Sequence, residues 1–164
     1  MQYILLTIFF FSSLFWHPAF SNEESIQLKL TVFEEITFQD KHQKIVTKLI
    51  APTNVTPNDT VVYITEYQNN SAQEARNVKI TVPIPQHLIY ISNSATKPSA
   101  SESILVHFSV DQGQRFDTLN RLTVTDATGK KHPANPENYT HIRWVIPSIA
   151  AESIGFVQFK AKLK

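Results

Sequence analysis

The sequence predicts an all-β protein, an antiparallel β-sandwich of about seven to nine strands. Three observations support this prediction. Past residue 25, segment after segment alternates apolar and polar residues with a period of two. Clusters of Pro, Asn, Asp and Ser separate these segments. None of the segments has the i, i+3, i+4 spacing of an amphipathic helix. Short strands joined by frequent turns are typical of two packed antiparallel sheets.

The alternation also gives the position of each strand. Pro83 and Pro85 end one of them, because two residues without an N–H donor cannot sit inside a ladder of hydrogen bonds. Leu88 and Tyr90 follow as expected core residues in the crossing between sheets. The expected strands cover residues 28–38, a short stretch ending near 50, and residues 61–68, 78–82, 104–110, 122–124, 142–146 and 157–163.

One face of each strand should supply the core. In the strand at 61–68 we choose the face with the two tyrosines, since the opposite face carries Glu66 and Gln68. In the last strand, the lysines at 160, 162 and 164 point away from the core and are expected to protect an exposed sheet edge. The residues predicted for the core are Tyr63, Tyr67, Val78, Ile80, Trp144 and Phe159.

The N-terminus predicts export. Residues 4–16 are almost wholly apolar and uncharged, and 13 residues are fewer than the roughly 20 that a membrane-spanning helix needs. Such a segment is typical of a secretory signal peptide. Small residues at Ala19 and Ser21 predict cleavage after Ser21, which assigns residues 1–21 to the signal and residues 22–164 to a single domain. An uncleaved membrane anchor is the alternative; after cleavage no transmembrane anchor is expected.

Composition excludes several function classes. The 164 residues include 15 Lys and Arg against 14 Asp and Glu, a net charge of +1 that gives no electrostatic reason to expect nucleic acid as a partner. The chain has no cysteine, so stability must come from packing and hydrogen bonding without disulfides. The same absence excludes thiol catalysis, zinc–thiolate sites and iron–sulfur clusters.

A longer order of residue types resembles a known family. It runs from Pro57-Asn58-Asp59-Thr60 through the tyrosine-bearing strand and the Asn69 turn to Ala75-Arg76-Asn77-Val78 and Pro83-Ile84-Pro85. This order is similar to the bacterial conserved repeat domain, also called domain of unknown function eleven, although Asn58 stands where that family has Gly. The stretches at 109–116 and 138–144 are similar to a single-domain Gram-negative subgroup. The resemblance covers roughly residues 26–164 and implies an immunoglobulin-like sandwich in the cell envelope, with no assigned chemistry.

A short motif predicts a braced turn. Ser109, Asp111, Gly113 and Phe116 match the Asp-box pattern Ser-x-Asp-x-Gly-x-x-aromatic. In such a turn the Ser and Asp side chains bond turn backbone, Gly takes a positive φ, and the aromatic ring packs beneath. Glycan-cleaving propellers repeat this box over several hundred residues, so the length of this chain argues against a sialidase and favours the structural role.

Catalytic and metal sites are not expected. No serine lies in a Gly-x-Ser-x-Gly elbow, and the adjacent carboxylates of Glu34 and Glu35 should point to opposite faces of a strand. The histidines form no i, i+2 or i, i+4 pair that would prepare a metal site. Asp59, Asp111, Asp117 and Asp126 lack the spacing of a calcium loop and are interpreted as solvated loop residues. We therefore predict no enzyme, no cofactor and no metal.

The expected function is a non-catalytic exported module of the envelope or cell surface, with a protein-interaction or structural role. Its location would be periplasmic, outer-membrane-associated or extracellular, and its partner an unknown envelope protein or surface component. The loops at 93–103 and 126–139 are the expected binding face, since a rigid sandwich often presents recognition loops at its ends. Two alternatives stay open: a metal- or small-ligand-binding periplasmic protein, and a module whose edge strand pairs with a strand of a partner.

Overall fold

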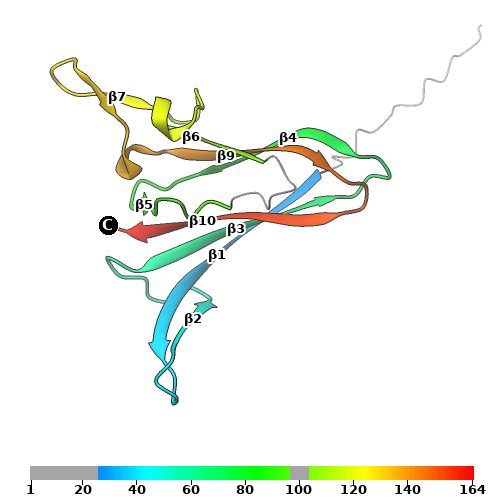
Figure 1. The fold of residues 1–164 in the computed structure, drawn as a ribbon, viewed down its shortest axis with the longest axis vertical. Helices are drawn as coiled ribbons and strands as arrows, with labels where there is room; N and C mark the ends of the chain where they lie inside the picture. The colour runs from blue at the N-terminus through cyan, green and yellow to red at the C-terminus, as the bar shows by residue number, and fades with distance from the viewer. Residues whose placement is uncertain (1–25, 97–103) are drawn as a thin grey trace, which may run out of the picture.

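The computed structural model describes residues 26–96 and 104–164, and the expected signal peptide at 1–21 lies outside them. The described chain is an all-β sandwich of antiparallel strands, which confirms the predicted fold class (Figure 1). One sheet has five strands in the order β2-β1-β3-β10-β5, and the facing sheet has three in the order β4-β9-β6. A separate hairpin, β7-β8, brings the total to ten strands, more than the seven to nine expected.

The long strands follow the alternation in the sequence, and three of the ten strands have only three residues each. Between them lie two 3₁₀ turns, η1 and η2. Among the described residues no helix is long and apolar enough to span a bilayer. The elements are β1 Ile26–Gln39, β2 Ile45–Ile50, β3 Thr60–Asn69, β4 Ala75–Pro83, β5 Leu88–Tyr90, β6 Leu105–Ser109, η1 Leu119–Arg121, β7 Thr123–Thr125, β8 Lys131–Pro133, η2 Pro136–Asn138, β9 His141–Ile149 and β10 Ile154–Leu163.

The core lies between the two sheets, where β10 faces the three-stranded sheet. Its largest side chains are Trp144 on β9 and Phe159 on β10, both fully buried, with ring centroids 6.3 Å apart. Tyr90 on β5 packs edge-on against Phe108 on β6 at 5.0 Å. Aromatic pairs of this kind add to the free energy of area burial, so these contacts hold the two sheets together without a disulfide.

Three of the six predicted core residues are fully buried: Ile80, Trp144 and Phe159. The other three, Tyr63, Tyr67 and Val78, are half-buried and pack against the margin of the core. The inward face of β3 was predicted correctly, but its buried positions are Val61, Thr65 and Asn69 rather than the tyrosines. Tyr63 lies flat against Phe159 at 4.9 Å, and burial raises the pKa of its phenol.

The expectation that the lysines of β10 guard a sheet edge is wrong. β10 lies between β3 and β5, and the segment that follows β5 continues the ladder, since the N–H of Ile91 and the N–H of Thr96 donate to the carbonyls of Lys160 and Gln158. The ammonium of Lys160 pairs with the carboxylate of Glu35 across the outer face of β3. β10 is therefore a central strand.

The five-stranded sheet extends beyond the three-stranded sheet on one side. β1 pairs with β3 along residues 26–35 and with β2 along residues 34–39. The outer half of β1 and all of β2 form a hairpin that projects from the sandwich, at the lower end of Figure 1. Because β4 is the last strand of the smaller sheet, no strand among the described residues continues that sheet over β1.

A fully buried asparagine joins the turns at one end of the sandwich. Asn69, the last residue of β3, donates from Nδ2 to the carbonyls of Gln73, Ile149 and Ala150 at 2.7, 3.2 and 3.0 Å. Its Oδ1 accepts from the N–H and hydroxyl of Ser71. The side chain thus connects the β3–β4 turn to the end of β9, and its removal leaves several buried carbonyls without a donor.

We expect Asn69→Ala to lower the free energy of unfolding by about 2–4 kcal/mol, because an unpaired buried polar group costs about 1–3 kcal/mol. Urea denaturation followed by tryptophan fluorescence measures the loss. The neighbouring Asn70 is exposed, so Asn70→Ala is the matched control and should change stability by less than about 0.5 kcal/mol. Equal effects of the two substitutions would contradict the role assigned to Asn69.

Candidate functional site

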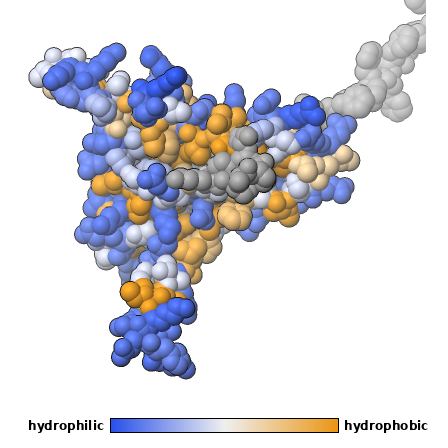
Figure 2. Space-filling view, viewed as in Figure 1, coloured by the Kyte–Doolittle hydropathy of each residue, from blue (hydrophilic) through white to orange (hydrophobic). Residues whose placement is uncertain are grey.

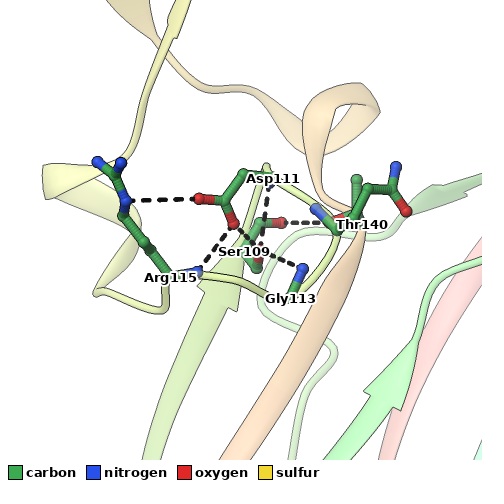
Figure 3. A network of polar contacts seen from close by, with 6 residues as sticks. Ser109, Asp111, Gly113, Arg115 and Thr140 are labelled. Carbon is green, nitrogen blue, oxygen red and sulfur yellow. Dashed lines mark hydrogen bonds and ion pairs between the residues drawn. The ribbon is translucent and has the colours of Figure 1, made fainter.

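The Ser109 turn follows β6 and has the braced geometry that its motif predicts (Figure 3). The buried hydroxyl of Ser109 donates to Asp111 Oδ1 at 2.8 Å and accepts from the N–H of Gly113 at 2.9 Å. The same Asp111 oxygen accepts from the N–H of Arg115 at 2.9 Å. These hydrogen bonds lower the pKa of Asp111, led by the one from the Arg115 N–H. Gly113 takes a φ of 81°, in the left-handed region that favours glycine.

The aromatic residue of the motif packs on the outer face of the three-stranded sheet, next to the turn. Phe116 is half-buried, and the centroid of its ring lies 3.5 Å from the Arg143 guanidinium carbon and 6.5 Å from the ring of His141. Arg143 also donates from Nε to the Thr81 hydroxyl at 2.9 Å. The turn is therefore fastened to the sheet by a cation–π contact on its outer surface. Burial, together with the Arg143 charge, lowers the pKa of nearby His141.

The β7–β8 hairpin contains most of the second expected binding loop, residues 126–139. Asp126 organises it: Oδ1 accepts from the N–H and hydroxyl of Thr128 and from the N–H of Lys130, and Oδ2 contacts His132 Nε2 at 2.7 Å. These contacts lower the pKa of Asp126 to about 2, with the Thr128 hydroxyl as the largest cause. Of the first expected binding loop, residues 93–103, the part from 97 to 103 lies outside the described residues.

The acidic residues considered for calcium brace separate turns. Asp59 accepts from the N–H and hydroxyl of Thr56, which lowers the pKa of its carboxyl. Asp117 accepts from the N–H of Thr118, while Asp111 and Asp126 hold the turns described above. In the part of the chain that the structure describes, no group of three or more His, Asp or Glu side chains is placed to share a metal ion.

The other candidates for chemistry are also separated. Glu34 and Glu35 are consecutive residues of β1, so they point to opposite faces, and Glu35 is paired with Lys160. An apolar pocket of about 330 Å³ lies between Tyr90 and Phe108, with Ala95 and Leu119 in its wall. Asn93 and Ala95, from the first expected binding loop, line it, so the pocket has room for a small apolar group beside that loop.

The most distinctive surface lies on β1 and β2. Ten large hydrophobic side chains are exposed in the described residues, and six of them belong to these two strands. Four of them lie on the face that turns toward the smaller sheet, whereas Ile45 and Leu49 lie on the opposite face, so the set wraps around the hairpin. We call this set the β1–β2 surface. Figure 2 shows hydrophobic residues where the projecting hairpin joins the sandwich, above a hydrophilic tip. Such a gathering marks an interaction site more often than isolated exposed residues do. The six residues are Leu28, Leu30, Phe38, Ile45, Leu49 and Ile50.

A cleft continues this surface into the sandwich. It has a volume of about 560 Å³ and lies between the start of β1 and the middle of β4, where Ile26 and Leu28 face Val78 and Ile80. Gln27 and Lys79 also line it. The cleft reaches Ile80, a fully buried residue.

Sequence reasoning located the alternation in the first strand but missed its consequence. Leu28, Leu30 and Val32 were correctly placed on one face, yet only the sheet order reveals that the smaller sheet leaves part of that face uncovered. A local signal exists in the second strand, where Leu49 and Ile50 are consecutive and belong to opposite faces. If the protein covers one of these two side chains, the other must point to the opposite face and be exposed there.

Comparison with known proteins gives no match: no protein-family model, no curated protein and no solved structure aligns significantly with this chain. The candidate site therefore rests on the geometry described above.

We predict that Thr128→Val raises the pKa of Asp126 from about 2 toward its usual 3.8, because the largest stabilising contact of the carboxylate is lost. A carboxyl NMR titration measures this pKa. Since folding lowers it, the contribution of Asp126 to stability is complete above about pH 4 and is lost as the pH falls through about 2. Thr125→Val, at the exposed neighbouring residue, is the control and should leave the titration unchanged. An unaltered Asp126 that titrates near 3.8 would refute this assignment.

Proposed function

We propose that this chain is an exported, non-catalytic module of the cell envelope that acts by protein–protein contact through the β1–β2 surface. The observation that carries the proposal is the concentration of exposed hydrophobic side chains on these two strands. Leaving them in water forfeits about 25 cal/mol for each Å² of apolar area that a partner would cover. A protein–protein contact would recover this free energy.

The surface combines features that favour a protein partner over a small ligand. It is an extended ribbon rather than an enclosed cavity, and both of its faces carry exposed apolar side chains: Ile45 is 72% exposed and Leu49 43% exposed on one face, and Ile50 is exposed on the other. At its outer end the Lys48 Nζ lies 5.1 Å from the centroid of the Phe38 ring, so a positive charge borders the apolar area. An apolar centre with a polar rim is the usual anatomy of protein interfaces.

The envelope assignment rests on two features of the sequence. The apolar segment at 4–16, followed by small residues at Ala19 and Ser21, is typical of a secretory signal. The order of residue types over roughly residues 26–164 resembles the conserved repeat domain of bacterial envelope proteins. Both features favour a periplasmic, outer-membrane-associated or extracellular location.

A photo-crosslinking amino acid in place of Leu49 tests the proposal in the organism that makes the protein. We expect Leu49 to give a covalent adduct of defined mass in the envelope fraction, because this side chain lies in the proposed interface. Thr123, exposed on the separate β7–β8 hairpin, is the matched control position and should give none.

Two results would refute the proposed function. One is the absence of an adduct at Leu49 in protein of normal abundance. The other is recovery of the unprocessed chain, with residues 1–21, from the cytosol alone.

A further inference from the structure

The first half of β1 has one free edge. Residues 26–33 pair with β3 on one side, whereas β2 occupies the other side only from Glu34 onward. Within residues 26–96 and 104–164, no backbone hydrogen bond reaches residues 26–33 from that second side. Alternate N–H and C=O groups of a regular strand point outward there and can pair with another strand.

The other sheet edges are short, distorted or bridged, whereas this one is long and regular. β4 is not a regular strand throughout, because Asn77 has a φ of 53° and the register of β4 with β9 is interrupted there, beside Pro147. β5 has three residues, and β6 is capped by a bridge from Phe108 to Asp117. β2 has only six residues.

Residues 26–33 contain no Pro, no Gly and no break in register, and Lys29 is their only charge. Natural proteins usually block an edge of this kind. An unblocked edge of eight residues is therefore typical of a strand that has a partner.

The apolar side chains along this edge could pack against those of a second strand with the same sequence. Ile26, Leu28, Leu30 and Val32 alternate on the inward face, and Leu28 and Leu30 are 53% and 49% exposed. Directly opposed residues of antiparallel strands lie on the same face of the sheet. A second copy laid antiparallel would therefore place apolar side chains against apolar side chains.

The charge of Lys29 and the length of the unpaired edge favour one register for the two β1 strands. If Lys29 faced Lys29 of the second copy, two like charges would be opposed, which is unfavourable. If Leu30 faces Leu30, then Lys29 faces Thr31, Leu28 faces Val32, and Gln27 faces Phe33. That ladder of residues 27–33 ends where Glu34 is already paired with Ile50 of β2, so it fills the open part of the edge in both copies.

We propose that residues 27–33 of β1 pair antiparallel with the same residues of a second copy, with the two Leu30 residues opposed on a two-fold axis. The two five-stranded sheets then form one continuous sheet, and the leucines of each copy cover those of the other. This inference rests on the proposed function, because it names the partner of one part of the β1–β2 surface.

The oligomeric state of the purified chain tests the pairing. Sedimentation should show a mass that doubles as concentration rises. Leu30→Lys should raise the dimer Kd by at least about tenfold, because it opposes two charges at the two-fold axis. Ile154→Lys is the matched control, since Ile154 is 63% exposed on the outer face of β10, and it should leave the Kd unchanged.

Single cysteines test the register, and the chain has no cysteine of its own to interfere. Leu30→Cys should form a disulfide-linked dimer, since opposed residues have Cα atoms about 4.5–5.5 Å apart, within disulfide range. Leu28→Cys should not, because the two Leu28 residues would be four positions out of step, about 14 Å along the strand. Leu105→Cys, on β6 and 55% exposed, controls for random collision.

A chain that stays monomeric at all concentrations would overturn this inference. So would faster linkage through Leu28→Cys than through Leu30→Cys, which would show a different register. Neither result contradicts the proposed function if Leu49 still forms an adduct with a different protein in the envelope. Conversely, if the purified chain dimerises but Leu49 gives no adduct in the envelope, the pairing of β1 is supported and the proposed contact with another envelope protein is refuted.

Discussion

Packing between two sheets of unequal width determines the rest of this structure. Without a cysteine, the sheets are held by side chains alone, chiefly by Trp144 against Phe159. The three-stranded sheet is wide enough to bury the faces of β3, β10 and β5 but not that of β1. The same packing that stabilises the fold therefore leaves Leu28 and Leu30 in contact with water, and the candidate site is a consequence of the sheet widths.

The sequence predicted the fold class because alternation is a local property. The strand positions around Ile80, Trp144 and Phe159 could be found from neighbouring residues alone. Sheet order is not local: whether Tyr67 is covered, or whether Lys160 lies on an edge or in the middle of a sheet, depends on strands far away in the chain. Asn69 also could not be assigned from its neighbours in the sequence. It begins an Asn-Asn-Ser stretch that is typical of an exposed turn, yet it is fully buried and bonds to carbonyls from two turns.

The candidate site was predictable only in part, for the same physical reason. The bonds of Ser109 and Asp111 span a few residues, so a short motif predicts them. Phe116 instead meets Arg143, which is distant in sequence and is placed by β9. Predicting the β1–β2 surface needs knowledge of three strands at once. These are β1 itself, β2, which leaves one side of the first half of β1 without a neighbouring strand, and β4, which ends the facing sheet.

The central claim is that residues 27–33 of β1 are a free strand edge that becomes paired on association. Amide hydrogen exchange at two protein concentrations tests it most directly, because it reports on each backbone N–H. The account predicts that the N–H groups facing away from β3 in this segment exchange rapidly in dilute solution and slowly in concentrated solution. The edge of β4, residues 75–83, should exchange equally in both. Protection of residues 27–33 that does not change with concentration would contradict the account.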